Sequence, residues 1–413
     1  GTDGALACAI MHQLFQQNLC DWEYLERYTD HPREFQAHLA SRSPAWAAQI
    51  TGVPAQEIEA FARLYGETKR SFIRLGIGFA RSRNGAHNLH AVSCLPAVTG
   101  AWRHTGGGAL LATSDLFHLD KTLIEALDAI SADVRMLDMS RIGPVLCGDP
   151  ADLGEGPPVK AMFIQNTNPM AVAPDQGAVR KGFSREDLFV CVHEQFMTET
   201  ARMADIVLPA TGFLEHDDIY QSYGQMYLQM GRQVISPPGE CRSNHRVICD
   251  LAERLGADHP GFRMSEAEII DATLEASGYP GISDMTEQRW LDCSRPFEEM
   301  NFLDGFEWPD GRFRFRPDWE ALGPLGASMP DYPDHWPAIA EADAEHPLRL
   351  ITPPARTFLN TSFTETPSSR AKENAPFLRM HPGDAIPLEI GTGDTVRLGN
   401  SQGELTLDAM VSD

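Results

Sequence analysis

Short apolar runs alternate along the chain with longer segments in which apolar residues recur every three or four positions. The helical spacing predicts helices over residues 3–18, 54–65, 86–99 and 245–255. The short runs predict strands over residues 71–75, 162–165, 188–192 and 204–209. Because strands alternate with helices, we predict an α/β fold with mostly parallel, helix-covered sheets in the central domains.

Glycine and proline interrupt the remaining segments. Residues 143–158 are predicted to form a loop, and residues 276–346, crowded with Pro, Asp, Trp and Phe, are predicted to be irregular. Three β-like runs then follow at residues 348–352, 394–398 and 404–408. The chain is therefore expected to end in a β-rich domain.

Composition narrows the function classes. The 413 residues are enough for two or three domains, and no apolar run approaches the roughly 18 residues of a membrane span. Acidic residues outnumber basic ones by 58 to 34, and a net charge of −24 argues against binding nucleic acid.

Eight cysteines without a Cys-x-x-Cys pair favour buried thiols in a reducing, cytoplasmic compartment over a zinc or iron–sulfur site. The chain opens on Gly1 without an initiator Met or a signal-like segment, so it is expected to be the interior of a longer polypeptide.

Polar turns of specific composition follow two of the predicted strands. The strand at 162–165 runs into Asn166-Thr167-Asn168-Pro169, and the strand at 188–192 runs into the segment His193–Ala201. Ligands of open α/β sheets bind just beyond the carboxyl ends of the strands. A bound cofactor is therefore expected at these two turns.

The same segments resemble a known family. The ordered series Asn-x-Asn-Pro, Glu-x-Phe-x-Thr-x-Thr-Ala and Ala-Asp-Ile-Val-Leu-Pro resembles the dimethyl-sulfoxide-reductase family of molybdopterin oxidoreductases, which carry two guanine-dinucleotide pterins. Residues 1–6 and 350–362 agree with it, and the resemblance is weakest between residues 256 and 345. It implies four parts: the remainder of a first α/β pterin-dinucleotide-binding domain (1–66), a second such domain (67–256), an irregular connecting region (257–345) and a truncated β-barrel domain (346–413).

The resemblance also implies an activity. Molybdenum or tungsten would be held by the sulfurs of two molybdopterin guanine dinucleotides and one protein ligand. The enzyme would then transfer an oxygen atom or a hydride, with two electrons, to or from a small-molecule substrate. An electron-transfer protein or subunit would be its partner. In relatives the metal ligand and any 4Fe-4S motif lie upstream, so this chain is expected to supply cofactor-binding segments, to be inactive alone and to carry no identifiable catalytic residue. The sequence Ala112–Asp115 departs from formate-dehydrogenase-like members, which carry an Arg-Gly pair there. The alternative is a metal-free structural subunit of an electron-transfer complex that retains the fold.

By the same resemblance, polar residues from several segments contact the pterin dinucleotides. Local interpretations stay open for some of them: Asp3 and Thr198 suit helix caps, Asn168 suits a turn, Glu194 could be a solvated strand end, and His216 could face solvent. The full set of candidates is Thr2, Asp3, Gly76, Phe79, Asn168, Pro169, His193, Glu194, Thr198, His216, Asn244, Thr352, Arg356, Asn360 and Thr361.

Two further expectations concern a pair of arginines and the arrangement of the predicted cofactor loops. Arg81 and Arg83, just beyond the Gly-x-Gly at Gly76, either pair with a pyrophosphate or are solvated charges. The segments 166–169, 193–198 and 352–361 are expected to converge on one cleft.

Overall fold

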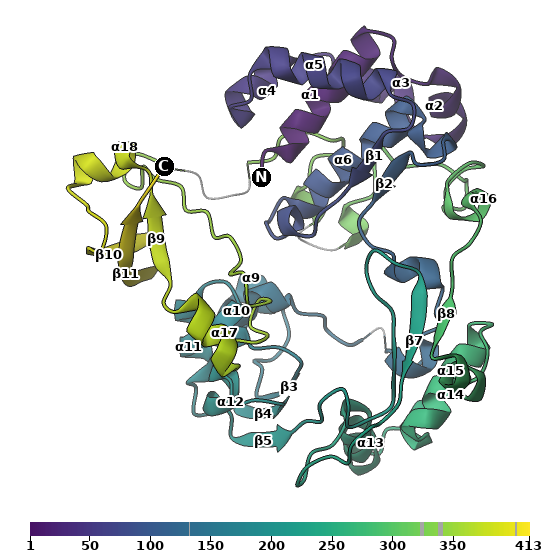
Figure 1. Cartoon of the computed structure of the whole chain (residues 1–413), viewed down its shortest axis with the longest axis vertical. Coiled ribbons are helices and arrows are strands. Elements are labelled where there is room, and N and C mark those ends of the chain that lie inside the picture. The colour runs from purple at the N-terminus through teal and green to yellow at the C-terminus, as the bar shows by residue number, and fades with distance from the viewer. Residues whose placement is uncertain (132, 323–325, 338–341, 401–402) are drawn as a thin grey trace. The chain divides into compact units, whose positions relative to one another are not determined.

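The computed structural model describes residues 1–131, 133–322, 326–337, 342–400 and 403–413 (Figure 1). The chain divides into two compact units, each assembled from segments that are far apart in sequence. Unit 1 comprises residues 1–118, 221–228 and 292–341, and unit 2 comprises residues 119–220, 229–291 and 342–413. The division into four domains that the resemblance implies stays a prediction.

Unit 1 is a group of helices beside a small parallel sheet. Its principal helices are α1 (Asp3–Gln16), α2 (Trp22–Tyr28), α3 (Pro32–Leu39), α4 (Pro44–Thr51), α5 (Ala55–Glu67) and α6 (Gly85–Thr99). Two strands, β1 (Phe72–Arg74) and β2 (Gly108–Leu110), pair in parallel with Phe72 opposite Gly108. Helix α1 buries Ile10, Met11 and Leu14, which recur at helical spacing, in the core of the unit. The helices predicted over 3–18 and 86–99 are confirmed.

Residues after 292 complete the core of unit 1. Phe315 is fully buried, and its ring stacks on that of Phe35 with 4.3 Å between centroids. Phe302 stacks on Phe306 and meets Trp102 edge to face. The prediction of irregular structure over 276–346 is therefore only partly right. The region contains α15 (Ile282–Gln288), β8 (Trp290–Asp292) and α16 (Phe297–Met300), and its aromatic side chains pack into a core that sequence periodicity does not indicate.

Asp334 connects the segment 333–336 to the helices of unit 1 by hydrogen bonds. Its carboxylate accepts two hydrogen bonds from the guanidinium of Arg42, at 2.9 and 2.5 Å. Its backbone N–H donates to Nε2 of His87 at 3.0 Å, and two residues later the carbonyl of Trp336 accepts from Asn84 at 2.9 Å. Gly4, in the first turn of α1, lies so close that a Cβ there would be 2.6 Å from the carbonyl oxygen of Asp334. The segment 333–336 therefore holds the N-terminal turns of α1 and α6 together.

Unit 2 is built on a parallel sheet of order β3-β4-β5 (Figure 1). Its strands are β3 (Ala161–Gln165), β4 (Phe189–Glu194) and β5 (Ile206–Pro209). Gln165 lies opposite His193, and His193 lies opposite Leu208. The three strands predicted here are confirmed, as is the α/β fold class.

Helices cover one face of this sheet. They are α8 (Ile142–Cys147), α9 (Pro150–Leu153), α10 (Pro169–Val172), α11 (Gln176–Phe183) and α12 (Glu199–Met203). The core of this layer contains Ile164, Val190 and Val192, which are nearly inaccessible. On the other face Phe163, Phe189 and Ile206 are exposed.

The predicted loop over 143–158 is wrong, because α8 and α9 lie within it. Gly143 in α8 would place a Cβ only 2.7 Å from the backbone nitrogen of Val179 in α11, and Gly182 in α11 would place one 2.6 Å from Cβ of Leu146. The glycines thus serve the close packing of two helices, and Pro144 lies in the first turn of α8, where proline is tolerated.

The rest of unit 2 contains helices and two small sheets. Helices α7 (Thr122–Glu125), α13 (Asn244–Leu255) and α14 (Glu266–Ala276) accompany a sheet of order β6-β7-β8, in which β6 (Asp218–Tyr220) pairs with β7 (Tyr227–Gly231) in an antiparallel manner. Helix α13 ends at Gly256, whose φ of +70° suits a left-handed C-cap. Every helix in the described residues is too short or too polar to cross a bilayer.

The C-terminal segment forms a mixed sheet of order β10-β11-β9. Its elements are α17 (Pro367–Glu373), β9 (Phe377–Met380), α18 (Pro382–Ala385), β10 (Thr395–Asn400) and β11 (Gly403–Val411). The strands predicted at 394–398 and 404–408 are confirmed. The strand predicted at 348–352 is wrong, because these residues have no strand partner in the described structure.

Replacing Asp334 with Asn should lower the free energy of unfolding by about 2 kcal/mol. Its side chain is 18% exposed and that of Arg42 is 25% exposed, so the pair lies between surface pairs, worth about 0–1 kcal/mol, and fully buried pairs, whose disruption costs about 3–5 kcal/mol. The change is measured by urea denaturation followed by tryptophan fluorescence, since six of the seven tryptophans belong to unit 1. The matched control is Asp331→Asn, which breaks an exposed pair with Arg316 and should cost less than about 1 kcal/mol.

The effect of Asp334→Asn should also depend on pH. Burial raises the pKa of Asp334, but the hydrogen bonds from Arg42, the backbone N–H of His335 and nearby positive charge outweigh it, so the pKa of this carboxyl is lowered. A lowered pKa in the folded state stabilises the protein above the ordinary value of about 4, and this contribution is lost as the pH falls through the lowered value. The difference between wild type and variant should therefore shrink below about pH 4, and a difference independent of pH would contradict this account.

Candidate cofactor site

The two polar turns predicted from the sequence lie side by side at the carboxyl edge of the parallel sheet. Their strands β3 and β4 are hydrogen-bonded neighbours that end at Gln165 and Glu194. Asn166 begins the first turn with a φ of +58°, a left-handed conformation that asparagine tolerates better than most residues. The expected proximity of segments 166–169 and 193–198 is thus confirmed.

Asn168 joins the first turn to the helix that follows the second. The Asn168 side chain is 3% exposed, and its Nδ2 donates to a carboxylate oxygen of Glu199 at 2.8 Å. Its Oδ1 accepts from the hydroxyl of Thr200 at 2.6 Å and from the backbone N–H of Thr200 at 3.2 Å. The hydrogen bond from Asn168 is the main cause that lowers the pKa of Glu199. Asn168 therefore cross-links the two loops, and Pro169 beside it is buried in the first turn of α10.

His193 is a second buried link at this edge. Its side chain is 1% exposed, Nδ1 lies 3.0 Å from Nε2 of Gln165, and Nε2 lies 3.1 Å from the carbonyl oxygen of Arg242. Both ring nitrogens are thus used by the protein. His193 connects β3, β4 and the segment that leads into α13.

Glu194 and Thr198 have different environments in the second turn. Oε1 of Glu194 accepts the backbone N–H of Gln195 at 2.7 Å, and Oε2 makes no hydrogen bond with the described residues. Thr198 is nearly buried, and its hydroxyl accepts the N–H of Ala201 at 3.2 Å. Thr198 is therefore the N-cap of α12, which agrees with the helix-cap interpretation of this residue. The second carboxylate oxygen of Glu194 is available to a ligand.

Asn244 reaches the same edge from the start of α13. Its Oδ1 is 3.4 Å from Nε2 of Gln165, and its Nδ2 is 3.3 Å from Oδ1 of Asn166. Asn166 and Asn244 are exposed, and Gln165 is half-buried. Three amide side chains, two from the end of β3 and the turn that follows it and one from the start of α13, therefore meet at this edge of the sheet, where Figure 1 places the ends of β3 and β4 near α13.

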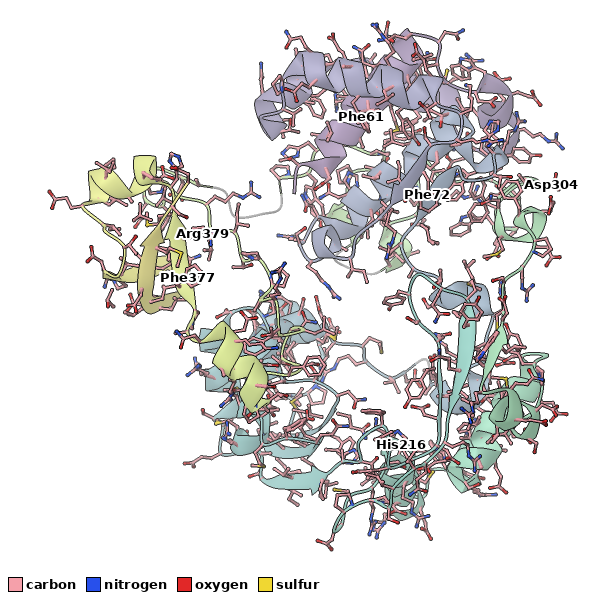
Figure 2. All side chains as sticks on the ribbon, viewed as in Figure 1. Phe61, Phe72, His216, Asp304, Phe377 and Arg379 are labelled. Carbon is pink, nitrogen blue, oxygen red and sulfur yellow. The ribbon has the colours of Figure 1, made fainter. Side chains whose placement is uncertain are left out.

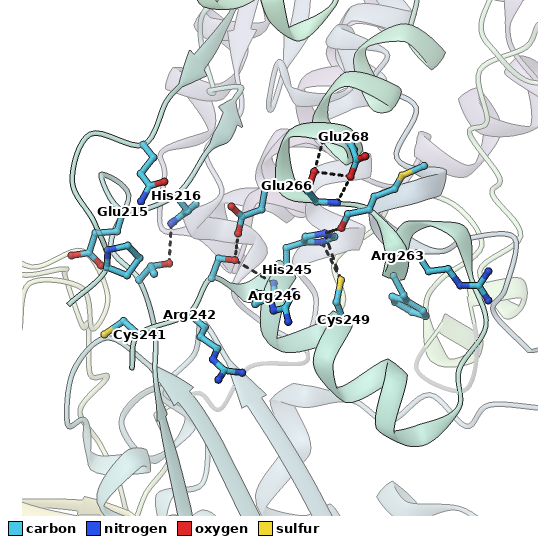
Figure 3. A pocket seen from close by; sticks show the side chains of 17 residues that line it. Glu215, His216, Cys241, Arg242, His245, Arg246, Cys249, Arg263, Glu266 and Glu268 are labelled. Carbon is cyan, nitrogen blue, oxygen red and sulfur yellow. Dashed lines mark hydrogen bonds between the residues drawn. The ribbon is translucent and has the colours of Figure 1, made fainter. Parts of the chain in front are cut away.

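His216 lies between β5 and β6 in the chain (Figure 2). It contributes to a cavity of about 550 Å³ together with residues of the loop 233–243 and of α13 and α14 (Figure 3). Nδ1 of His216 is 2.9 Å from the hydroxyl of Thr211, and Nε2 is 3.8 Å from the carboxylate of Asp218. Burial raises the pKa of Asp218, with nearby Glu266 adding to the effect and His216 opposing it. The expected contact of His216 with a cofactor stays a prediction.

The candidates in unit 1 lie at the N-terminus of α1 and in the loop between β1 and α6. Thr2 is the N-cap residue and Asp3 is the first helical residue, while Gly76 lies in the loop between β1 and α6. Asn84, at the end of that loop, donates to the carbonyl of Gly1 at 3.0 Å. Gly76 is exposed, and a Cβ there would meet nothing within 4 Å. Phe79 belongs to a 3₁₀ turn at Gly78–Ala80, and its side chain lies outside the described part of the structure.

The candidates of the last loop are largely exposed. Thr352, Arg356 and Asn360 are exposed, and Thr361 is half-buried. Thr357 of this loop donates through its backbone N–H and its hydroxyl to Glu373 of α17, at 2.5 and 2.6 Å. The hydrogen bonds of Thr357 thus tie the loop to α17. The convergence of the 352–361 loop on the strand-end turns stays a prediction.

The cysteines and acidic residues supply no metal site in the described residues. No group of three or more His, Cys, Asp or Glu is arranged there to hold an ion, and the eight cysteines are free thiols. In the family that the sequence resembles, the metal is bound mainly by pterin sulfur, so candidate residues are those that hold the nucleotide ends.

Sequence reasoning missed Gln165 and Asn166 as members of the site, although it placed both at the strand end. Polar residues that end a buried strand were the available signal. Thr200 and Arg242 were missed for a different reason. They act through a hydroxyl and a backbone carbonyl that bond to distant residues, and no local pattern marks such contacts.

Comparison with known proteins gives the family. The family model described as "Molybdopterin oxidoreductase" matches residues 1–254, and the model described as "Molydopterin dinucleotide binding domain" matches residues 348–413. The chain belongs to the molybdopterin oxidoreductases. The resemblance drawn from the strand-end motifs is confirmed, and so is the expectation of a molybdopterin dinucleotide cofactor.

Individual relatives of this molybdopterin oxidoreductase extend along the entire chain. It is 36% identical to the probable oxidoreductase YoaE of Bacillus subtilis, 100% of the chain matching 60% of that protein. It is 25% identical to the F420-dependent formate dehydrogenase subunit alpha of Methanocaldococcus jannaschii, of which it spans 62%. It is 26% identical to a dimethyl sulfoxide/trimethylamine N-oxide reductase of Cereibacter sphaeroides, of which it spans 56%. The chain thus spans about three-fifths of such relatives.

A solved structure shows the same fold. Acetylene hydratase from Pelobacter acetylenicus superimposes with a TM-score of 0.75 over 100% of this chain and 61% of its own, at 21% sequence identity. At this identity the likeness concerns the fold alone.

Replacing Asn168 with Asp should destabilise the joined loops of this molybdopterin oxidoreductase. The variant places a second carboxylate against Glu199 and removes a hydrogen bond to a charged acceptor, which is worth about 1.5–3 kcal/mol. Thermal unfolding at neutral pH should show a lower midpoint, and the loss should diminish in acid as one of the two carboxylates takes up a proton.

Asn166→Asp is the matched control for this variant. Asn166 is exposed in the same turn, so its replacement should change the midpoint little. Equal effects of the two variants would show that the cross-link by Asn168 does not stabilise the loops.

Proposed function

We propose that this chain supplies the cofactor-binding segments of a molybdenum or tungsten oxidoreductase that carries two molybdopterin guanine dinucleotides. The complete protein would transfer an oxygen atom or a hydride equivalent, with two electrons, to or from a small molecule. The observation that carries the proposal is the group of polar side chains at the carboxyl edge of the parallel sheet, within a chain of this family. Glu194, Asn166 and Asn244 are all accessible there, where open α/β sheets bind their ligands.

The residues at this edge fit the nucleotide end of such a cofactor. Guanine presents adjacent N1–H and N2–H₂ donors, and the carboxylate of Glu194 has one oxygen without a hydrogen bond among the described residues. Asn166 and Asn244 add amide groups that donate and accept. We therefore assign Glu194 to the guanine, with the amides beside it.

The candidates elsewhere support the same proposal. Thr2 and Asp3 stand at the N-terminus of a 14-residue helix, whose free N–H groups favour anionic or acceptor groups. The loop 352–361 lies inside the segment that matches the dinucleotide-binding model, and its exposed hydroxyl, amide and guanidinium side chains suit the second dinucleotide.

The chemistry is divided between cofactor and protein. The bound metal–pterin group would supply the two-electron redox step. The residues described above would bind and orient the nucleotide ends.

An electron-transfer protein or subunit belongs to the same proposal, because one relative is named as the alpha subunit of an F420-dependent enzyme. A cytoplasmic location is also part of it, supported by the free thiols.

Metal and pterin analysis of the protein expressed from its complete coding sequence tests this function. We expect molybdenum or tungsten together with two pterin guanine dinucleotides per chain. A well-folded protein that contains neither, from a host that loads other enzymes of this class, would favour the metal-free structural subunit.

Replacing Glu194 with Gln should weaken cofactor binding while the protein still folds. The amide puts an NH₂ donor where the guanine N–H donors need an acceptor. Loss of a charged hydrogen bond costs about 1.5–3 kcal/mol, which is roughly a tenfold to hundredfold loss of affinity. The measured quantities are the pterin and metal content of the purified variant.

Glu186→Gln provides the control for this comparison. Glu186 is exposed, whereas Glu194 is half-buried, and it lies before β4, at the opposite end of the strand from Glu194. It should leave the cofactor content unchanged. If Glu194→Gln also retained full content, Glu194 would be a solvated strand end and not a nucleotide ligand.

A further inference from the structure

The cavity of about 550 Å³ is enclosed by three segments of unit 2 (Figure 3). The first is the loop after β5, which contributes Thr211, Glu215 and His216. The second is the loop 233–243 with the first two turns of α13, and the third is the segment 262–268, which leads into α14. Ligand pockets of folded proteins commonly measure about 300–1,000 Å³, so this cavity has room for a small molecule.

The arginines at this cavity are paired with carboxylates outside its lining. Arg242 and Arg246 both contact Asp250, at 2.6 and 2.9 Å. Arg263 pairs with Asp258, and the side chains of all three arginines are more than half exposed. In Figure 3 the guanidinium groups of Arg242 and Arg263 point away from the centre of the cavity. The arginines therefore add hydrocarbon stems to the wall more than charge to the interior.

The carboxylate of Glu266 supplies negative charge inside the cavity. Glu266 is the first residue of α14 and is half-buried. Its Oε1 accepts a hydrogen bond from the hydroxyl of Ser243, the N-cap of α13, and its Oε2 makes no hydrogen bond with the described residues. Burial is the main cause that raises the pKa of nearby Asp218, and the charge of Glu266 raises it further. Glu266 thus has an unused acceptor in an environment that disfavours more negative charge.

Apolar side chains form another part of the wall. Phe262 and Met264 line the cavity, and Phe262 belongs to the 3₁₀ turn Pro260–Arg263. The ring of Phe262 meets that of His259 edge to face, with 5.6 Å between centroids. His259 is 4% exposed, and its Nε2 lies 3.0 Å from the carboxylate of Asp128. A buried, bonded histidine therefore holds the aromatic ring in place. An aromatic face attracts a cation, as a carboxylate does.

We propose that this cavity binds a small organic ammonium ion, with its charged group at Glu266 and its apolar part against Phe262 and Met264. The N–H groups of the ligand would donate to Oε2 of Glu266, and its hydrocarbon part would displace water from the apolar wall. An anionic ligand would meet the carboxylate of Glu266 while the arginines are already paired. The inference goes beyond the proposed function, because the dinucleotide cofactor carries negative phosphates and this ligand carries the opposite charge.

Three ligands of nearly equal shape test the preference for charge: 2-phenylethylammonium, 2-phenylethanol and phenylacetate. Dissociation constants are measured by ligand-observed NMR titration at neutral pH on the protein expressed from its complete coding sequence. An ionic strength of about 0.15 M screens charges more than about 8 Å away. We expect the ammonium ion to bind about tenfold more tightly than the alcohol, since a charged hydrogen bond is worth a factor of this order. Phenylacetate should bind more weakly than the alcohol.

Other results with these ligands would overturn the proposal. Equal affinities for the ammonium ion and the alcohol would show that charge is not recognised. Tighter binding of phenylacetate would identify an anion site. A lack of saturable binding of the ammonium ion would show that the cavity is no site for this class of ligand.

Glu266→Gln tests whether the ammonium ion binds in this cavity. The amide keeps the shape of the side chain and an oxygen that can accept from Ser243, but it removes the charge. The affinity for 2-phenylethylammonium should fall about tenfold, and that for the alcohol should change little. The matched control is Glu275→Gln, which removes the same charge from an exposed position near the other end of α14 and should leave both affinities unchanged. Equal losses in the two variants, or no loss in Glu266→Gln, would overturn the proposal.

Phe262→Leu covers the case in which Glu266→Gln does not fold, as judged by its unfolding midpoint. Leucine keeps an apolar side chain and removes the aromatic face. The affinity for the ammonium ion should fall about threefold relative to that for the alcohol, the size of a modest cation–π interaction. An unchanged ratio of the two affinities would contradict the placement of the ligand against Phe262.

Discussion

The parallel hydrogen-bonded register of β3, β4 and β5 is the constraint on which the candidate site depends. Because Gln165 lies opposite His193, the turns that follow these two strands must leave the sheet at the same edge. Asn168 then fixes the first turn to Glu199 and Thr200 beyond the second, so that both loops are held by buried bonds within the chain. A ligand that binds at this edge would meet two loops whose backbone positions are already held, so little conformational entropy of the loops needs to be lost on binding.

Much of this arrangement could be predicted from sequence, because strands and turns are marked locally. Apolar runs ended by Asn166 and by Glu194 gave the strands and the edge where polar residues gather. The bonds of Asn168 and His193 could not be predicted, since they join residues far apart in the chain. The same reason explains the strand predicted at 348–352: its residues suit a strand, but a strand exists only when another segment pairs with it. Gly143 was read as a loop residue because sequence alone does not show that a neighbouring helix approaches it closely.

An acidic protein that binds an anionic dinucleotide needs short-range interactions. The net charge of −24 opposes a phosphate-bearing cofactor at a distance, but salt screens such repulsion beyond about 8–10 Å. At the sheet edge the groups offered are neutral amides and one carboxylate suited to guanine donors. Nearby, Arg242 and Arg246 both pair with Asp250, so their charge is partly neutralised within the protein. In the proposed function, specific hydrogen bonds, more than net charge, would therefore account for recognition of the cofactor at this edge.

A structure of the protein with its cofactor bound, determined by diffraction or electron microscopy, tests the central claim most directly. Our account predicts a guanine within hydrogen-bond distance of the Glu194 carboxylate, with the amides of Asn166 and Asn244 beside it at the carboxyl edge of the sheet. A dinucleotide bound elsewhere on the protein, with Glu194 facing only solvent, would contradict the account.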